Sequence, residues 1–186
     1  MEKSDTEEKA ELRRKFLQLR REIPSLRRQA WDEDLCRQIL DHPAITQSKT
    51  VFAYLSRNGE ADTRQAISAL LHAGKRVLTP SPDIKALPHD GLFKICFNRQ
   101  EACLAEPEIC GESRIDQLDA IIVPGVIWDL EGYRVGFGGG YFDRLLEMAR
   151  PDCVSLGLAY PVQVISRVPR QPWDRKVSDL LQPAVS

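Results

Sequence analysis

The sequence predicts an α/β fold: a single domain in which a largely parallel sheet is flanked by helices in a Rossmann-like, three-layer arrangement. Three observations lead to this prediction. A strand pattern, a helix pattern and a second strand pattern follow one another between residues 50 and 79. The run LDAIIV at 118–123 is almost entirely apolar, as in a strand that is buried on both faces of a sheet. The 186 residues contain no repeat and no linker that would divide them.

Two helices are expected first, in an N-terminal helical segment that covers residues 5–41. The first helix carries an apolar stripe that ends at Pro24 and consists of Leu12, Phe16, Leu19 and Ile23. The second is predicted over Ser25–Leu40, with Leu26, Ala30, Leu35 and Ile39 facing inward. An α/β body follows over residues 49–186, and the whole chain 1–186 is expected to form one domain.

The strand–helix–strand unit begins at Thr50–Leu55, a short β-branched and apolar run. Asp62 or Thr63 is the expected N-cap of the helix that follows, and Gly74 ends that helix. Arg76–Thr79 is the second strand. A unit of this length is typical of a parallel βαβ crossover.

Four further elements are expected along the body. Leu92–Phe97 alternates as a half-exposed strand or hairpin does, whereas Leu118–Val123 is a buried strand. Tyr141–Ala149 is predicted to be a helix and Cys153–Ala159 a strand. Together these elements complete a sheet that helices cover.

The composition excludes several classes of function. A formal net charge of −1 does not favour binding to nucleic acid or to an anionic membrane. The five cysteines have no metal-binding spacing and are odd in number, which favours a reducing compartment. The first residues show no apolar core of a signal peptide, and no run approaches the roughly 18 apolar residues of a membrane span. A cytoplasmic protein is expected.

A glycine-rich loop at Gly136–Gly140 is the strongest functional signal. Such a loop can turn its backbone N–H groups toward an anion, and the predicted helix at Tyr141 adds its own free N–H groups. Arg134 and Arg144 flank the loop as candidate partners for phosphate oxygens. A turn used only for tight packing is the alternative. The loop lacks the GK[ST] of a Walker A motif and is a poor dinucleotide fingerprint.

Two carboxylates are candidate ligands for Mg²⁺, which binds one or two carboxylates together with phosphate oxygens. Asp143 is expected in the first turn of the helix after the glycine loop, where it could also simply complement the helix dipole. Asp174 belongs to the segment QPWDRK and can reach the loop only through the fold.

The segment VPGVIWDLEGYRVGFGGGYFDRLL resembles the glycine loop of the 5-formyltetrahydrofolate cyclo-ligases, the 5,10-methenyltetrahydrofolate synthetases. The resemblance extends over nearly the whole chain. KAELRRK is similar to the family's opening, LSRNGEADT to its Gly-Glu-x-Asp-Thr segment, and AEP to a Glu-Pro element; Gln163 and Trp173–Asp174 fit the tail. Gly139 stands where some members carry a basic residue, and residues 81–111 match weakly.

The resemblance implies an ATP- and Mg²⁺-dependent ligase that joins the N5-formyl group of 5-formyltetrahydrofolate to N10. The products are 5,10-methenyltetrahydrofolate, ADP and phosphate. In this chemistry the formyl oxygen takes the γ-phosphoryl group, N10 attacks the activated carbon, and phosphate leaves. Such a reaction needs positioning and neutralisation of charge more than a protein nucleophile. The partners are therefore small molecules, without nucleic acid or membrane, and the chain is expected to be a monomer or a weak homo-oligomer.

The resemblance also assigns roles to residues. Those implied to bind ATP are Lys9, Arg13, Arg134, Gly136, Phe137, Gly138, Gly139, Gly140, Tyr141 and Phe142. Arg134 and Asp143 are implied to be catalytic, and Asp143 and Asp174 to bind the metal. Leu55, Glu60 and Tyr141 are implied to bind the folate.

The neighbouring basic residues Arg14, Lys15, Arg20 and Arg21 are expected to form a solvent-exposed face, and Trp31 and Trp173 to be core or interface anchors. Two alternatives to the ligase remain at this stage. One is a non-catalytic relative that binds folate or nucleotide without turnover. The other is a nicotinamide-dependent oxidoreductase on a similar fold, which only the glycines would support.

Overall fold

The computed structural model describes residues 5–57, 59–80, 92–97 and 108–184. Five α-helices in this part of the chain are α1 (Asp5–Arg21), α2 (Ser25–Asp41), α3 (Pro43–Gln47), α4 (Arg64–His72) and α5 (Tyr141–Met148). The strands are β1 (Thr50–Ala53), β2 (Arg76–Pro80), β3 (Leu92–Phe97), β4 (Glu108–Arg114), β5 (Ala120–Val123), β6 (Ile127–Asp129), β7 (Arg134–Val135), β8 (Val154–Leu158), β9 (Val164–Ile165) and β10 (Asp179–Leu181). Two 3₁₀ turns are η2 (Ile115–Gln117) and η3 (Pro161–Gln163).

The main sheet has the strand order β10-β8-β5-β1-β2-β3-β4. Its first five strands are parallel, with Val51 of β1 opposite Val77 of β2 on one side and Ala120 of β5 on the other. The predicted parallel βαβ unit is therefore confirmed. β3 and β4 add an antiparallel hairpin at one edge, so the expected strand or hairpin at Leu92–Phe97 is also found.

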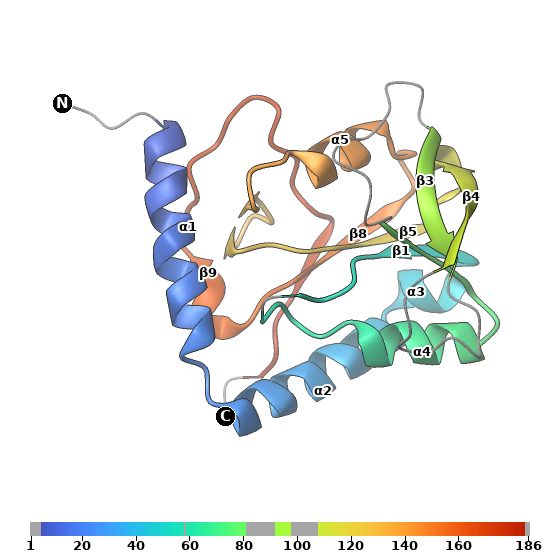
Figure 1. Cartoon of the computed structure of the whole chain (residues 1–186), viewed down its shortest axis with the longest axis horizontal. Coiled ribbons are helices and arrows are strands. Elements are labelled where there is room, and N and C mark those ends of the chain that lie inside the picture. Colours follow the sequence, from blue (N-terminus) through green and yellow to red (C-terminus); the bar gives the residue numbers. More distant parts are fainter. Residues whose placement is uncertain (1–4, 58, 81–91, 98–107, 185–186) are drawn as a thin grey trace.

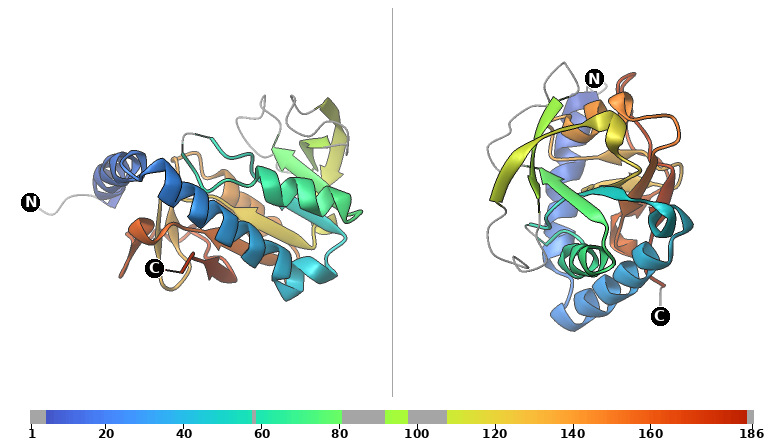
Figure 2. Two further views of the ribbon diagram at one scale, coloured as in Figure 1. Left: turned by 90° about the horizontal axis from the view of Figure 1, so that it is seen from below. Right: turned by 90° about the vertical axis from the view of Figure 1, so that its right-hand side faces the viewer.

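Both faces of the parallel strands are buried, and each contributes to a different hydrophobic cluster. Val51 and Ala53 pack with residues of α2 and α4, whereas Phe52 between them packs with Leu145 of α5. This alternation follows from the two-residue repeat of a strand. In Figure 1, α5 lies on one side of the sheet and α2, α3 and α4 on the other, and Figure 2 shows α2 and α4 side by side. The three-layer prediction is confirmed.

Helix α1 packs away from the layers, against a small second sheet of order β7-β6-β9. Phe16 of α1 joins a cluster with Val126, Ile127, Val135 and Val168. In Figure 1, α1 stands at one end of the molecule beside β9. The small sheet was not predicted, because strands of two or three residues are too short to show a period.

The expected inward faces of the first two helices are only partly right. Phe16, Ile23, Leu35 and Ile39 are buried, but Leu19 is 36% exposed, Leu26 is 81% exposed, and Ala30 is exposed. Helix α1 ends at Arg21, so the stripe does not continue in register to Pro24. The buried residues of α2 lie in its second half, where it meets α4 and β10, so Leu26 in the first turn lies outside the core.

No helix in the described ranges is both long enough and apolar enough to cross a membrane.

Candidate active site

The glycine loop connects β7 of the small sheet to α5. Gly138 has φ +104° and Gly140, the residue before the helix, has φ +62°, so both occupy backbone conformations that other residues rarely adopt. A Cβ placed on Gly136 or Gly139 would meet no atom within 4 Å. These two glycines therefore border open space, whereas a loop used only for tight packing would have neighbouring atoms there.

A cavity of about 630 Å³ lies in front of this loop. The predicted ATP and metal residues Lys9, Arg13, Arg134, Gly136, Phe137, Gly138, Gly139, Gly140, Tyr141, Phe142, Asp143 and Asp174 all line it, together with Thr6, Ala10, Pro80, Pro124, Val135, Gln171 and Trp173. Pro80 ends β2 and Pro124 follows β5, so the cavity opens at the carboxyl ends of the parallel strands. Ligands of open α/β sheets bind at this edge.

Helix α1 contributes two cations from one face, because Lys9 and Arg13 are four residues apart. Lys9 Nζ donates to Asp174 Oδ2. Arg13 Nε donates to the carbonyl oxygen of Gly136 at 2.7 Å. The helix thus touches both the C-terminal segment and the start of the glycine loop.

Arg134 is buried at the base of the cavity, and each of its terminal nitrogens holds a protein group. Nη2 donates to Asp143 Oδ1 at 3.0 Å, and Nη1 donates to the carbonyl of Arg175 at 2.8 Å. The backbone N–H of Arg175 also donates to Asp143 Oδ1, at 3.1 Å. Burial lowers the pKa of Arg134, while the carboxylates of Asp143 and Asp174 raise it. The two candidate metal ligands therefore act on the same buried cation.

The turn before Arg134 is organised by Asp129, a fully buried carboxylate. Its Oδ1 accepts hydrogen bonds from the backbone N–H groups of Glu131 and Tyr133. Its Oδ2 accepts hydrogen bonds from the backbone N–H of Val168 and from the guanidinium of Arg170. Burial alone would raise the pKa of Asp129, but these donors hold it below its ordinary value. Asp129 thus fixes the path of the chain into β7.

Asp143 and Asp174 could hold one metal ion only if other ligands joined them. Among the described residues there is no group of three His, Cys, Asp or Glu side chains that could bind a metal alone. Asp174 Oδ2 also accepts the backbone N–H of Gln171 at 2.7 Å. Two carboxylates beside a phosphate-sized opening suit Mg²⁺, which usually takes its remaining ligands from phosphates and water.

The aromatic residues at the start of α5 face the core as well as the cavity. Tyr141 stacks on Phe52 at 6.4 Å between ring centroids, and Phe142 meets the same ring edge-on at 6.2 Å. Burial raises the pKa of Tyr141, and its buried hydroxyl has no hydrogen-bond partner among the described residues.

Two predicted folate residues do not line this cavity. Leu55 packs at the rim of the core on the α2–α4 side. Glu60 is partly buried in the loop before α4, where its carboxylate accepts the backbone N–H of Arg57 at 2.8 Å. Burial raises the pKa of Glu60, although the Arg57 N–H and the charge of Arg20 oppose this shift. Most of the weakly matching segment 81–111 lies outside the described residues.

One expectation about neighbouring residues is wrong, and a second is wrong only as far as it concerns the core. Arg14, Lys15 and Arg21 are exposed as expected, but Arg20 is only 1% exposed. The sequence does contain a signal for this, because Arg20 continues the spacing of Lys9 and Arg13 along one helix face. Trp173, expected in the core or an interface, is 63% exposed and lines the cavity, whereas Trp31 packs against the core.

Comparison with known proteins identifies the family. The model of the 5-formyltetrahydrofolate cyclo-ligase family matches residues 5–183. The 5-formyltetrahydrofolate cyclo-ligase of Escherichia coli strain K12 is 26% identical over 174 residues, which cover 90% of this chain and 96% of that protein. The enzyme of the same name from Mycolicibacterium smegmatis is 28% identical, with 94% and 93% covered.

Solved structures agree with the family match. The NMR structure of Aquifex aeolicus 5,10-methenyltetrahydrofolate synthetase superposes with a TM-score of 0.76 at 32% identity, covering 94% of this chain and 89% of that one. A 5,10-methenyltetrahydrofolate synthetase from Mycoplasma pneumoniae has the same fold, with a TM-score of 0.72 at 23% identity over 92% and 96% of the two chains. The chain therefore belongs to the 5-formyltetrahydrofolate cyclo-ligase family and carries its ATP-using ligase activity in folate and one-carbon metabolism.

Proposed function

We propose that the cavity between α1, the glycine loop and the C-terminal segment binds MgATP, and that 5-formyltetrahydrofolate is cyclised beside it. One observation carries this assignment. The open glycines line the same cavity as five charged residues that are up to 165 residues apart in the chain: Lys9, Arg13, Arg134, Asp143 and Asp174. Cations, carboxylates and an open backbone loop together suit a triphosphate with its metal ion.

In this proposal the glycine loop and α1 bind the phosphates. The N–H groups at the start of α5 point toward an anion placed before Tyr141, and the helix dipole favours negative charge there. Lys9 and Arg13 would neutralise the phosphate oxygens from the opposite side. Gly136 and Gly139 leave room for the phosphates to approach the backbone.

The chemical step needs no protein nucleophile. The formyl oxygen attacks the γ-phosphorus and ADP leaves; N10 then attacks the formyl carbon and loses its proton, the carbon–oxygen bond breaks, and phosphate leaves with that oxygen. Asp143 and Asp174 would hold Mg²⁺, which supplies neutralisation of the charge on the transferred phosphoryl group. Arg134 holds Asp143 with one terminal nitrogen and the Arg175 carbonyl with the other. Its role is therefore to orient the metal-binding carboxylate.

The folate is proposed to lie toward Leu55 and Glu60, with Tyr141 between the two ligands. The Glu60 carboxylate is suited to accept hydrogen bonds from the N–H groups of the pterin, because it is partly buried yet balanced by cations. The whole chain is proposed to work as one domain, a monomer or weak homo-oligomer in the cytoplasm. Cys36 and Cys153 are free thiols, which suits a reducing compartment.

The test is formation of 5,10-methenyltetrahydrofolate from 5-formyltetrahydrofolate and MgATP, followed by its near-ultraviolet absorbance. We expect turnover by the wild type and a loss of at least about 100-fold in Asp143→Asn, because a ligand of the charge-stabilising metal is removed. Asp152→Asn is the matched control, since the Asp152 side chain is 74% exposed. No turnover by the folded wild type would overturn the function, and wild-type turnover by Asp143→Asn would overturn the metal site.

A further inference from the structure

An arginine behind the glycine loop is almost completely enclosed by the protein. Arg20 lies in the last turn of α1 and is one of the largest fully buried side chains described. Burial lowers the pKa of Arg20, which shows the cost of removing this charge from water. An arginine is seldom buried to this degree unless its surroundings compensate the charge. Its neighbours should therefore reveal what it does.

On one side Arg20 meets the tip of the glycine loop. Its guanidinium carbon lies 5.9 Å from the centroid of the Phe137 ring. Phe137 is 51% exposed and lines the proposed ATP cavity. A planar guanidinium over an aromatic ring is a favourable cation–π contact. The position of Phe137, and with it the loop tip, is thus linked to a buried charge.

On the other side Arg20 is affected by the charge of Glu60, one of the proposed folate residues: Glu60 raises the pKa of Arg20, and the charge of Arg28 lowers it. The uncharged hydroxyls of Tyr54 and Tyr160 belong to the same surroundings, and they donate to the backbone carbonyls of Ala61 and Glu60 at 2.9 and 3.4 Å. These groups come from the loop before α4, from the chain after β1, from the chain after β8 and from α2. Arg20 is therefore one of two cations, with Arg57, whose charges lower the pKa of the partly buried Glu60.

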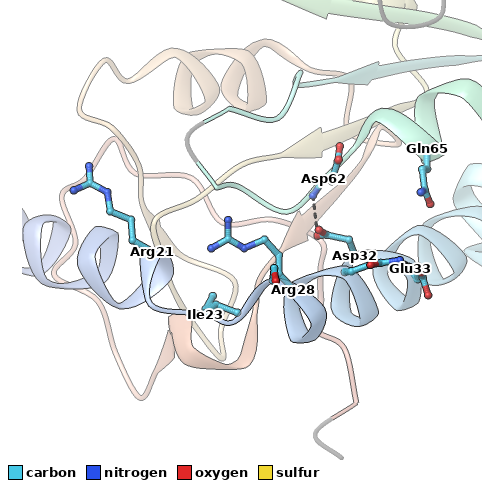
Figure 3. A pocket seen from close by; sticks show the side chains of 9 residues that line it. Arg21, Ile23, Arg28, Asp32, Glu33, Asp62 and Gln65 are labelled. Carbon is cyan, nitrogen blue, oxygen red and sulfur yellow. Dashed lines mark hydrogen bonds between the residues drawn. The ribbon is translucent and has the colours of Figure 1, made fainter.

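The position of Arg20 is fixed by a network around a second cavity, drawn in Figure 3. Arg28 Nη2 donates to the carbonyl oxygen of Arg20 at 2.6 Å. Asp32 accepts the Tyr160 hydroxyl at 2.6 Å and the backbone N–H of Asp62 at 3.0 Å, the latter marked by the dashed line. The start of α2 thereby ties the end of α1 to the loop that carries Glu60.

We infer that Arg20 is a positioning residue that couples the two substrate sites, because its side chain contacts the tip of the ATP loop at Phe137 while its backbone is tied, through α2, to the loop that carries Glu60. ATP that orders the loop through Phe137 then favours the arrangement of Arg20 and Glu60 that binds the pterin, and the folate favours ATP in return. Coupling of this kind is reciprocal by thermodynamic necessity. The inference rests on the proposed function. It adds that ligand binding at one of the two adjacent sites strengthens ligand binding at the other.

An arginine suits this role better than a lysine. The flat, delocalised guanidinium can lie with its face on an aromatic ring, whereas an ammonium group is a point charge on a flexible stem. Arg20→Lys should therefore retain the charge balance of Glu60 and lose the contact with Phe137. Arg20→Met should lose both and keep much of the volume.

The experiment measures steady-state kinetics and ligand binding in wild type, Arg20→Met, Arg20→Lys and Arg21→Met. Arg21 is the matched control, because it is the exposed neighbour on the same helix. Calorimetry gives the Kd of a non-hydrolysable ATP analogue with Mg²⁺, with and without saturating 5-formyltetrahydrofolate. We expect the folate to tighten analogue binding about fivefold in the wild type.

In Arg20→Met we expect the KM for 5-formyltetrahydrofolate to rise about tenfold, because Glu60 loses one of the two cations that lower its pKa. The tightening of analogue binding by folate should vanish. Arg20→Lys should restore most of the folate KM without restoring the coupling, and Arg21→Met should resemble the wild type. The melting temperature of each variant identifies any that fails to fold, in which case Arg20→Lys alone decides, through its lost coupling.

The inference is overturned if Arg20→Met keeps both the folate KM and the coupling, or if Arg20→Lys keeps the coupling. It is equally overturned if all kinetic constants decline together with the melting temperature, because that result describes a purely structural residue. Failure of the proposed function would give a different result, because the wild type and every Arg20 variant would then fail to convert 5-formyltetrahydrofolate.

Discussion

On the nucleotide side of the proposed site each cation already lies against a carboxylate or a carbonyl at the cavity wall, whereas on the folate side the arginine, Arg20, is fully buried and the carboxylate, Glu60, is partly buried. Lys9 contacts Asp174 and Arg134 contacts Asp143, and three of these four residues are partly accessible. Glu60 and Arg20, by contrast, act on each other through their charges: each changes the pKa of the other, and Arg57 and Arg28 act on them as well.

This difference suits the two ligands. A triphosphate and Mg²⁺ carry large charges, and a wall of accessible ion pairs can exchange its protein partners for ligand at modest cost. A pterin is flat and mostly uncharged, so it is recognised by a few placed hydrogen bonds in a drier environment. The nucleotide side should therefore determine the rate, and the folate side the binding of the folate.

The strongest way to test this division is to remove the charge of Asp174. Asp174→Asn takes away a proposed Mg²⁺ ligand and the partner of Lys9, so we expect kcat to fall about 100-fold with little change in the folate KM. Steady-state kinetics at saturating and varied folate measure both constants. Asp179→Asn is the control, because Asp179 is 55% exposed on the edge strand. A selective rise in the folate KM would contradict the division.

The next effect should come from Glu60. Glu60→Gln removes the charge but keeps the shape, so we expect the KM for 5-formyltetrahydrofolate to rise about tenfold while kcat changes little.

The pH dependence gives a second measure of the same carboxylate. Burial raises the pKa of Glu60 from its ordinary 4.5, so its ionised form is lost at a higher pH than in an exposed glutamate. If folate binding needs that form, kcat/KM for the folate falls as the pH is lowered through this raised pKa. Glu60→Gln should flatten this acid limb, which a profile of kcat/KM against pH would show. An unchanged limb would assign it to another group.

The smallest effects should separate two glycines of the loop. Gly139→Ala adds a methyl group that meets no protein atom, so the melting temperature should stay constant while the KM for ATP rises about threefold from crowding of the phosphates. Gly138→Ala must adopt φ +104°, so it should lose about 1 kcal/mol or more and lower the melting temperature by about 2–4 °C. Thermal melting and ATP kinetics distinguish them. Equal melting temperatures would contradict the assigned conformations.

The parallel core could be predicted because buried strands and short helices leave continuous apolar signals, as in LDAIIV. Leu26 was misassigned because an apolar stripe predicts an inward face but not whether a layer lies opposite it. The predicted nucleotide residues meet around one cavity because of long-range packing. The family resemblance implied that they meet, whereas hydrophobic periodicity could not predict it. Arg20 was missed because a buried cation has the same residue type as its exposed neighbours, and only its spacing from Lys9 and Arg13 distinguishes it.

The docking of α1 also has a consequence for how the chain is made. This helix is synthesised before its partners, yet Phe16 packs on Val126, Ile127, Val135 and Val168, and Lys9 meets Asp174. An isolated helix of 17 residues is at best marginally stable in water, so α1 must wait for those partners. Residues that α1 brings to the proposed site therefore take their places only after the chain has been synthesised as far as Asp174, and chains that stop before this residue lack a complete site for ATP.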